Sequence, residues 1–194
     1  MTELVGIFVG GGSTRMLGQP KGLLTAPRSS LTLVERLAGV VRQALPDAAL
    51  VLVGEHPAYA QLGVPAIADA PYDGAGPLAG LAALCREATR LAKPEILGLA
   101  CDLPYVEAEL VARLAHHALG QPAVAARVDN RWQPFFARYQ VERATPVVEA
   151  LVVSARRGLY GVLDGLGATE LPLSAEEARQ LRDWDTPEDV SAGS

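Results

Sequence analysis

The sequence lacks the features that mark nucleic-acid-binding and membrane proteins. Lysine and arginine total 17 against 22 aspartates and glutamates, which gives a net charge of −5, and only 5% of residues are aromatic. A nucleic-acid surface needs a basic excess with interleaved aromatics, so we expect no such partner. No apolar run approaches the roughly 20 residues that span a bilayer, and the N-terminus has no basic region followed by a long apolar one. We therefore expect a cytoplasmic protein without membrane contact, acting on a small molecule.

Cysteine is also scarce. The chain has two, Cys85 and Cys101, and their spacing matches no zinc or redox motif. We expect both thiols to be reduced and buried. Cys101 stands beside Asp102, which suggests a nucleophile, but none of the three histidines lies in a context that suggests a base. Because a free cysteine packs like a small apolar side chain, we expect Cys101 to belong to the core.

The chain does contain enough apolar content for one sizeable core, since 49% of its 194 residues are hydrophobic. Apolar strands alternate with amphipathic helices, which predicts a single α/β domain over residues 1–194. We expect a mostly parallel, Rossmann-like sheet with helices on both faces. The expected strands are 4–9, 49–53, 66–68, 96–100, 123–127, 135–139 and 169–171. The expected helices are 33–45, 77–91, 110–119, 145–155, 160–163 and 175–181.

Local signals set some of these boundaries. Ser30 or Thr32 is placed to cap the helix at 33–45, and Pro77 suits the first position of the next helix. An Asp-Asn-Arg turn at 129–131 separates two expected strands. It predicts an antiparallel pair that closes one edge of the sheet.

The most informative stretch runs from Gly10 to Gly22, directly after the first expected strand. It reads Gly-Gly-Gly-Ser-Thr-Arg-Met-Leu-Gly-Gln-Pro-Lys-Gly. Glycines that leave a strand expose backbone N–H groups that suit phosphate oxygens. Arg15 adds a fixed guanidinium fork and Lys21 a mobile point charge. We therefore predict a site for a nucleoside triphosphate; the alternative is a flexible turn with two solvated cations.

Known phosphate-binding fingerprints do not describe this stretch. A Walker A loop needs Ser or Thr after Gly-Lys, whereas Gly22 follows Lys21. The dinucleotide pattern would place a third glycine where Arg15 stands, and an acidic residue about twenty positions further on at the end of a second strand. This sequence has neither. The pattern that remains, Gly-x-x-x-x-Arg-Met-x-Gly-x-Pro-Lys, is far more specific than a lone glycine motif.

Acidic residues follow other expected elements. Asp69 comes after the strand at 66–68, Asp102 after the strand at 96–100, and Asp185 stands ahead of a short helix expected to begin at Thr186-Pro187. Ligands of such sheets bind outside the carboxyl ends of the strands, so we expect these segments to share one rim. Asp102 is the first-choice magnesium ligand, since Mg²⁺ takes one or two carboxylates plus substrate phosphates. The alternative is that Asp102 caps the next helix.

Four stretches together resemble the nucleotidylyltransferases of the molybdenum cofactor, and most closely the molybdenum cofactor guanylyltransferases. They are residues 10–24, 67–80, 100–104 and 183–189, and their order and spacing match the family. The resemblance implies transfer of GMP from GTP to the terminal phosphate of molybdopterin, with magnesium as cofactor and release of pyrophosphate. The implied partners are GTP, a molybdopterin-type phosphorylated substrate, and cofactor-synthesis or acceptor proteins.

The resemblance also implies roles for individual residues. Lys21, Arg15 and Asp102 are the expected catalytic residues: Arg15 holds the departing phosphates, Lys21 stabilises charge near the α-phosphate, and Asp102 binds the metal. The residues expected to hold the nucleotide are Gly10, Gly11, Gly12, Ser13, Thr14, Asp69, Gly76, Pro77 and Gly80. For the segment around Gly76 the alternative is a plain helix entry.

Two segments depart from the family. Asp183 and Asp185 stand where guanylyltransferases carry the asparagines of Asn-x-Asn-Thr-Pro. Asp185 either joins Asp102 as a second metal ligand or caps the helix at Pro187, and the resemblance implies that Asp183 contacts the pterin-bearing substrate. Glu55 replaces a family asparagine after the second strand; its carboxylate either accepts two N–H groups of guanine or is solvated.

Other functions stay open. One is a cytidylyl- or other nucleotidylyltransferase with a different phosphorylated acceptor, such as a sugar phosphate. Another is a non-catalytic carrier of nucleotide or cofactor, although a carrier has no need for a metal carboxylate. Gly-Pro-Leu-Ala-Gly at 76–80 and Gln133-Pro134 favour the guanylyl over the cytidylyl branch. The candidates for the acceptor pocket, with surface-turn roles as the alternative, are Tyr72, Arg127, Arg131, Trp132 and Gln133.

Overall fold

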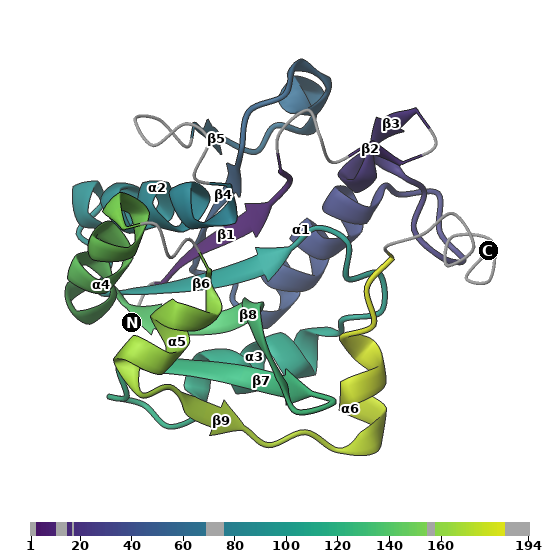
Figure 1. Cartoon of the computed structure of the whole chain (residues 1–194). Coiled ribbons are helices and arrows are strands. Elements are labelled where there is room, and N and C mark those ends of the chain that lie inside the picture. The colour runs from purple at the N-terminus through teal and green to yellow at the C-terminus, as the bar shows by residue number, and fades with distance from the viewer. Residues whose placement is uncertain (1–2, 11–14, 17, 69–75, 155–157, 185–194) are drawn as a thin grey trace.

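A seven-stranded sheet with the order β5-β4-β1-β6-β8-β7-β9 forms the centre of the computed structural model, which describes residues 3–10, 15–16, 18–68, 76–154 and 158–184 (Figure 1). The strands are β1 (Leu4–Phe8), β4 (Ala49–Val53), β5 (Ala66–Ile67), β6 (Glu95–Ala100), β7 (Ala123–Val128), β8 (Arg131–Gln140) and β9 (Thr169–Leu171). The pairings of β8 with β6 and β7 are antiparallel, and the others are parallel. The expectation of a mostly parallel sheet is confirmed.

Helices cover both faces of this sheet (Figure 1). On one face lie α1 (Leu33–Ala44) and α3 (Ala108–His116), and on the other lie α2 (Pro77–Arg90), α4 (Val141–Val153) and α5 (Tyr160–Leu166). Successive side chains of a strand point to opposite faces of the sheet. Val5 and Ile7 therefore pack with α1 and α3, whereas Leu4 and Phe8 pack with α2. No helix within the described ranges is both long and apolar enough to cross a bilayer.

Smaller elements complete the part of the fold near the rim. A short ladder pairs β2 (Arg15–Met16) with β3 (Gln19–Pro20), and the 3₁₀ turn η1 (Lys21–Leu23) follows at once. A second 3₁₀ turn, η2 (Pro57–Leu62), follows β4. The helix α6 (Ala175–Gln180) precedes the last described residues.

The antiparallel pairing of β7 and β8 is confirmed, but the expectation that this pair closes an edge is wrong. β8 lies between β6 and β7, and β9 pairs with β7 at the edge. The second half of β8 is buried and pairs with β6 from Phe136 onward, as an interior strand must. Pro134 lies before that ladder begins, so its missing N–H removes no bond to β6.

Several helix boundaries also differ from expectation; α5, for example, runs to Leu166 rather than to residue 163. α3 ends at His116 rather than at residue 119, because the fully buried Arg138 donates to the carbonyls of Ala115 and Ala118, at 2.9 and 3.0 Å. Such capping of the last carbonyls stabilises the helix end. α4 begins at Val141 rather than at 145 and contains Pro146. The early end of α3 is a tertiary effect that no local pattern reveals.

The start of α1 shows which of the two capping candidates is used. Thr32 Oγ1 accepts from the backbone N–H of Glu35 at 3.2 Å, and Glu35 Oε2 accepts from the N–H of Thr32 at 2.8 Å. This reciprocal capping box lowers the pKa of Glu35, chiefly through the hydrogen bond from the Thr32 backbone. Thr32, and not Ser30, is therefore the N-cap.

Replacing the N-cap tests this assignment. We expect Thr32→Ala to lower the free energy of unfolding by about 1 kcal/mol, and Ser30→Ala to change it by less than about 0.5 kcal/mol. Thr32→Ala keeps the backbone donor but removes the hydroxyl, whose hydrogen bond to Glu35 also lowers the pKa of that carboxyl, so part of the deficit should disappear as the pH falls through the folded-state pKa. Urea unfolding of the three proteins measures both effects, and equal losses for the two variants would contradict the assignment.

Candidate active site

The parallel register brings three loops to one level at the carboxyl edge of the sheet. Phe8 pairs with Val53 of β4 on one side and with Ala100 of β6 on the other. The pairing continues one step further, because Val9 N–H donates to Val53 O and Cys101 N–H donates to Phe8 O, both at 3.1 Å. The loop after β1 and the turn that carries Asp102 therefore leave the sheet side by side.

Lys21 and Asp102 meet at this edge. Lys21 Nζ lies 3.2 Å from Asp102 Oδ2, although the two residues are 81 positions apart in the chain. The two side chains are 16% and 19% exposed, so this ion pair is largely shielded yet still reachable from solvent. The ammonium group of such a pair can bind phosphate oxygens, and the carboxylate can bind a divalent metal.

Asp102 does not cap a helix, so that alternative is wrong. The N-cap of α3 is Glu107, several residues further along the chain. Asp102 lies in the turn between β6 and α3, where its backbone carbonyl accepts from the N–H of Trp184 at 3.1 Å. Its carboxylate is paired with Lys21.

Gly22 sets the position of Lys21. A Cβ at this buried glycine would lie 2.5 Å from Val34 Cγ2 and 2.9 Å from Tyr59 Oη, closer than real Cβ atoms approach. Only glycine lets η1 press against both α1 and η2. The neighbouring Lys21 is consequently held on a turn that rests on the core.

The start of the glycine stretch packs equally closely. Gly54 adopts a φ of +108°, and a Cβ there would lie 2.9 Å from the carbonyl oxygen of Gly10. The end of β4 thus lies directly against the backbone of Gly10. Arg15 belongs to β2 and pairs with Pro20 of β3. The predicted contacts of Gly11, Gly12, Ser13 and Thr14 lie outside the described residues.

The segment from Gly76 to Gly80 reaches the same edge through α2. This helix begins at Pro77 as predicted, with Gly76 as an N-cap at a φ of +60°. Gly80 is buried, and a Cβ there would lie 2.9 Å from Phe8 Cε1. The first turn of α2 therefore packs on the last residue of β1. Asp69 and Asp185, predicted for this rim, lie outside the described residues.

The two cysteines are free and buried, as expected. Burial raises the pKa of Cys85 to about 12. Burial and the adjacent Asp102 carboxylate raise the pKa of Cys101 well above its ordinary range. A thiol held so firmly in its protonated form is a core side chain rather than a nucleophile.

Glu55 and His56 follow β4 and take different positions. Glu55 is exposed, close to the end of the strand. His56 Nδ1 accepts from the N–H of Ala58 at 3.2 Å and caps η2, a structural role that the sequence analysis did not predict. The role of Glu55 in recognising guanine stays a prediction.

The turn between β7 and β8 extends to this edge as well (Figure 1). The Arg127 guanidinium lies 4.0 Å from the centroid of the Trp132 ring, and its Nη1 donates to Asn130 Oδ1 at 3.2 Å. A register shift between Ala125 and Arg127 marks a bulge, as is common beside functional sites. Contact with an acceptor stays a prediction for Arg127, Trp132, Arg131 and Gln133, and Tyr72 lies outside the described residues.

The donor set of the site fits a metal that is held mainly by substrate. The described ranges contain no group of three or more histidine, cysteine, aspartate or glutamate side chains able to hold an ion. Among the residues that the structure describes, the carboxylate paired with Lys21 at this rim is that of Asp102. Magnesium commonly binds through one or two carboxylates plus nucleotide phosphates, so a single protein carboxylate suits it better than zinc or calcium.

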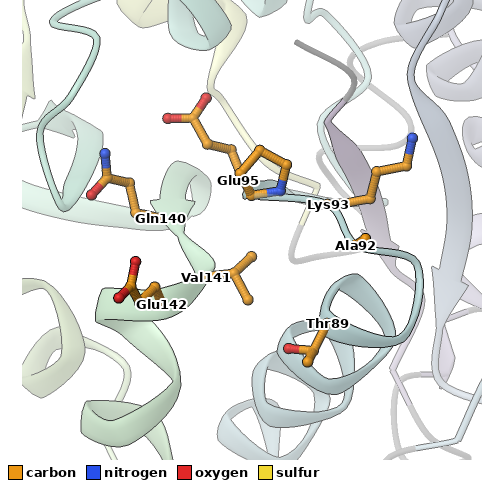
Figure 2. A pocket seen from close by; sticks show the side chains of 8 residues that line it. Thr89, Ala92, Lys93, Glu95, Gln140, Val141 and Glu142 are labelled. Carbon is orange, nitrogen blue, oxygen red and sulfur yellow. The ribbon is translucent and has the colours of Figure 1, made fainter.

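A cavity of about 630 Å³ lies elsewhere, between the end of α2 and the start of α4 (Figure 2). It is lined by Thr89, Ala92, Lys93, Pro94, Glu95, Gln140, Val141 and Glu142. Glu95 begins β6, whereas Asp102 follows the end of that strand. The cavity is therefore at the opposite end of the sheet from the Lys21–Asp102 pair.

Known proteins resemble this chain over most of its length. The model of the MobA-like NTP transferase domain matches residues 5–176. The molybdenum cofactor guanylyltransferase of Pseudomonas putida KT2440 is 31% identical over 183 residues, which cover 94% of this chain and 92% of that protein. The probable molybdenum cofactor guanylyltransferase of Mycobacterium avium is 28% identical over 191 residues, covering 98% and 94%.

Solved structures show the same fold. Molybdopterin-guanine dinucleotide biosynthesis protein A from Archaeoglobus fulgidus superposes with a TM-score of 0.75 at 21% identity, covering 98% of this chain and 96% of that one. The 2-C-methyl-D-erythritol 4-phosphate cytidylyltransferase from Thermus thermophilus superposes with a TM-score of 0.68 at 19% identity, covering 100% and 97%. At these identities the likeness concerns the fold alone.

Gly22 can be tested against a second glycine of the same region. We expect Gly22→Ala to lower the free energy of unfolding by about 1–3 kcal/mol, because the added methyl group overpacks the contact with Val34 and Tyr59. Gly39 in α1 has open space at its Cβ position, so Gly39→Ala should stabilise the protein by up to about 1 kcal/mol. Denaturant unfolding measures both. A Gly22→Ala protein as stable as the parent would contradict the close packing.

Proposed function

Since this chain belongs to the MobA-like NTP transferase family, we propose that it transfers GMP from GTP to the terminal phosphate of molybdopterin and releases pyrophosphate. The chain is a nucleotidyltransferase by family, and the relatives named above are guanylyltransferases of the molybdenum cofactor. The observation that carries the proposal is the Lys21–Asp102 pair at the carboxyl edge of the sheet, beside the start of the glycine stretch. We expect the enzyme to act in the cytoplasm, together with cofactor-synthesis or acceptor proteins.

The proposed reaction forms one phosphorus–oxygen bond and breaks another. An oxygen of the terminal acceptor phosphate attacks the α-phosphorus of GTP, and the bond to the bridging oxygen breaks as pyrophosphate leaves. Such a displacement needs in-line placement and neutralised charge rather than a protein nucleophile. This agrees with a site in which the nearby thiol, Cys101, is buried and held in its protonated form.

Lys21 and Arg15 are the proposed cationic residues of this reaction. Lys21 stabilises charge near the α-phosphate, because its mobile amine can exchange the Asp102 carboxylate for a phosphate oxygen. Arg15 and the backbone N–H groups of residues 11–14 hold the departing phosphates. The segment of Asp69, Gly76, Pro77 and Gly80 borders the nucleotide, and Glu55 is the proposed partner of the guanine edge.

Asp102 and Asp185 would hold the magnesium ion. Asp185 follows Trp184 directly in the sequence, and the N–H of Trp184 donates to the carbonyl of Asp102. When bound, magnesium supplies positive charge that neutralises the reacting phosphates. Asp183, the other substituted position of this segment, is proposed to contact the pterin-bearing substrate.

The choice of substrates is tested directly by pyrophosphate release. We expect the protein to release pyrophosphate from GTP, but not at a comparable rate from ATP, CTP or UTP, when molybdopterin and magnesium are both present. Omitting molybdopterin or adding a chelator should abolish release. Faster turnover with CTP would replace the guanylyl assignment by a cytidylyl one, and nucleotide binding without release would indicate a carrier.

The role of Lys21 is tested by substitution. We expect Lys21→Ala to lower kcat by on the order of a hundredfold, because one preorganised cation is lost from the site of developing charge. Lys93→Ala is the matched control: Lys93 lies beside the cavity at the other end of the sheet, and its loss should leave kcat within about twofold. Near-normal turnover of Lys21→Ala would remove this residue from the mechanism.

A further inference from the structure

Trp184 lies where three distant segments of the chain meet. Its side chain is only 2% exposed and packs in a small cluster of its own, separate from the two main cores. Leu24, Ala26 and Leu33 of this cluster come from the segment that follows Lys21. Tyr105 comes from the turn that carries Asp102. This cluster thus joins the two segments of the chain that supply the ion pair.

Two hydrogen bonds join Trp184 to the turn of Asp102. Its backbone N–H donates to the carbonyl of Asp102 at 3.1 Å, and its indole Nε1–H donates to Tyr105 Oη at 3.3 Å. The rings of Trp184 and Tyr105 meet edge to face, with centroids 6.4 Å apart. The turn is therefore held at both Asp102 and Tyr105.

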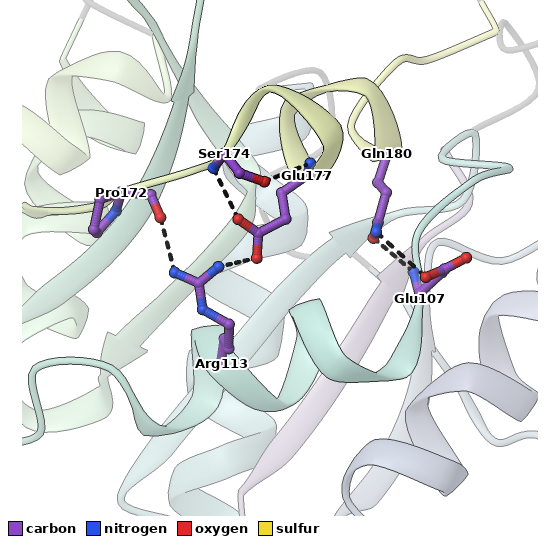
Figure 3. A network of polar contacts seen from close by, with 6 residues as sticks. All are labelled: Glu107, Arg113, Pro172, Ser174, Glu177 and Gln180. Atoms are coloured by element: carbon purple, nitrogen blue, oxygen red, sulfur yellow. Dashed lines mark hydrogen bonds and ion pairs between the residues drawn. The ribbon is translucent and has the colours of Figure 1, made fainter.

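The helix α6, which precedes Trp184 in the chain, is held against α3 by polar contacts (Figure 3). Arg113 of α3 pairs with Glu177 of α6 and donates to the carbonyl of Pro172 at 2.9 Å. Gln180 Oε1 accepts from the backbone N–H of Glu107 at 3.1 Å. Contacts near both ends of α6 therefore hold this helix against α3. The chain that leads to Trp184 starts from this fixed helix.

We propose that Trp184 is a positioning residue for the Lys21–Asp102 pair. The turn at residues 101–107 has no regular structure of its own, since β6 ends at Ala100 and α3 begins at Ala108. Apart from its ends, the turn receives hydrogen bonds from Trp184 and from Arg36, whose Nη2 donates to Val106 O at 2.8 Å, while its Leu103 and Val106 side chains are buried in the core formed with α1 and α3. The indole packs this turn against the segment after Lys21, and so sets the separation of amine and carboxylate. The inference rests on the proposed function for its catalytic consequence.

Three variants separate positioning from simple stability. We expect Trp184→Ala to lower kcat for pyrophosphate release by on the order of 10- to 100-fold, because small displacements of reacting groups are costly. Trp184→Phe keeps an aromatic ring in the cluster and should restore kcat to within about fivefold of the parent. Leu33→Ala is the matched control: it removes packing from the same cluster but has no hydrogen bond to the Asp102 turn, and should leave kcat within about threefold.

A Leu33→Ala protein with the same loss of kcat as Trp184→Ala, at a similar drop in Tm, would overturn the inference. It would show that the cluster acts only through stability. Failure of Trp184→Phe to recover activity beyond Trp184→Ala would overturn it as well, because the ring would then not be what holds the turn.

Amide hydrogen exchange of the full chain without substrate provides a readout that does not depend on activity. We expect Trp184→Ala to speed exchange in residues 101–107 by at least about tenfold, and Leu33→Ala to leave that segment unchanged. Unchanged exchange there in Trp184→Ala would overturn the inference. If exchange rises as expected while the parent protein releases no pyrophosphate with any nucleotide, Trp184 orders the turn as inferred and the proposed function is the part that fails.

Discussion

The parallel pairing of β1 with both β4 and β6 is the constraint on which the candidate site depends. Because Phe8 is in register with Val53 and with Ala100, the segments after these three strands begin at one level of the sheet. The loop after β1 starts the glycine stretch, and the turn after β6 carries Asp102. The same pairing buries β1 completely, so the rim rests on rigid backbone. Precise placement of charge is what a phosphoryl displacement requires.

Much of this arrangement could be predicted from the sequence. The apolar runs identified the strands, Pro77 marked the start of α2, and the rule that ligands bind at carboxyl ends of strands placed Lys21 and Asp102 on one rim. The rule could not show that the two residues pair directly, because it locates loops and not side chains. Asp102 as a helix cap was wrong, since α3 begins later than the Asp-Leu-Pro sequence suggests.

The features that escaped prediction share one physical origin: they depend on contacts between residues far apart in the chain. The early end of α3 follows from Arg138, a charged residue on β8 that reaches back to the carbonyls of the helix. The interior place of β8 follows from its pairing with β6. Trp184, between two aspartates near the end of the chain, has no local periodicity to reveal that its ring is buried. The partners of these residues lie far away in the sequence, so a local pattern cannot predict them.

Two ion pairs near the ends of β6 differ in a way that indicates their roles. At the opposite end of β6, Glu95 lies 3.8 Å from Arg138, and both side chains are almost fully buried. Arg138 also donates to the carbonyls of Ala115 in α3 and of Ala118 just beyond it, so moving it would leave buried groups unsatisfied, at a cost of about 1–3 kcal/mol each. Lys21 and Asp102 keep partial contact with water, so either partner can exchange the other for a ligand at lower cost. A pair that can exchange partners suits a binding site, whereas the Arg138 pair suits a structural one.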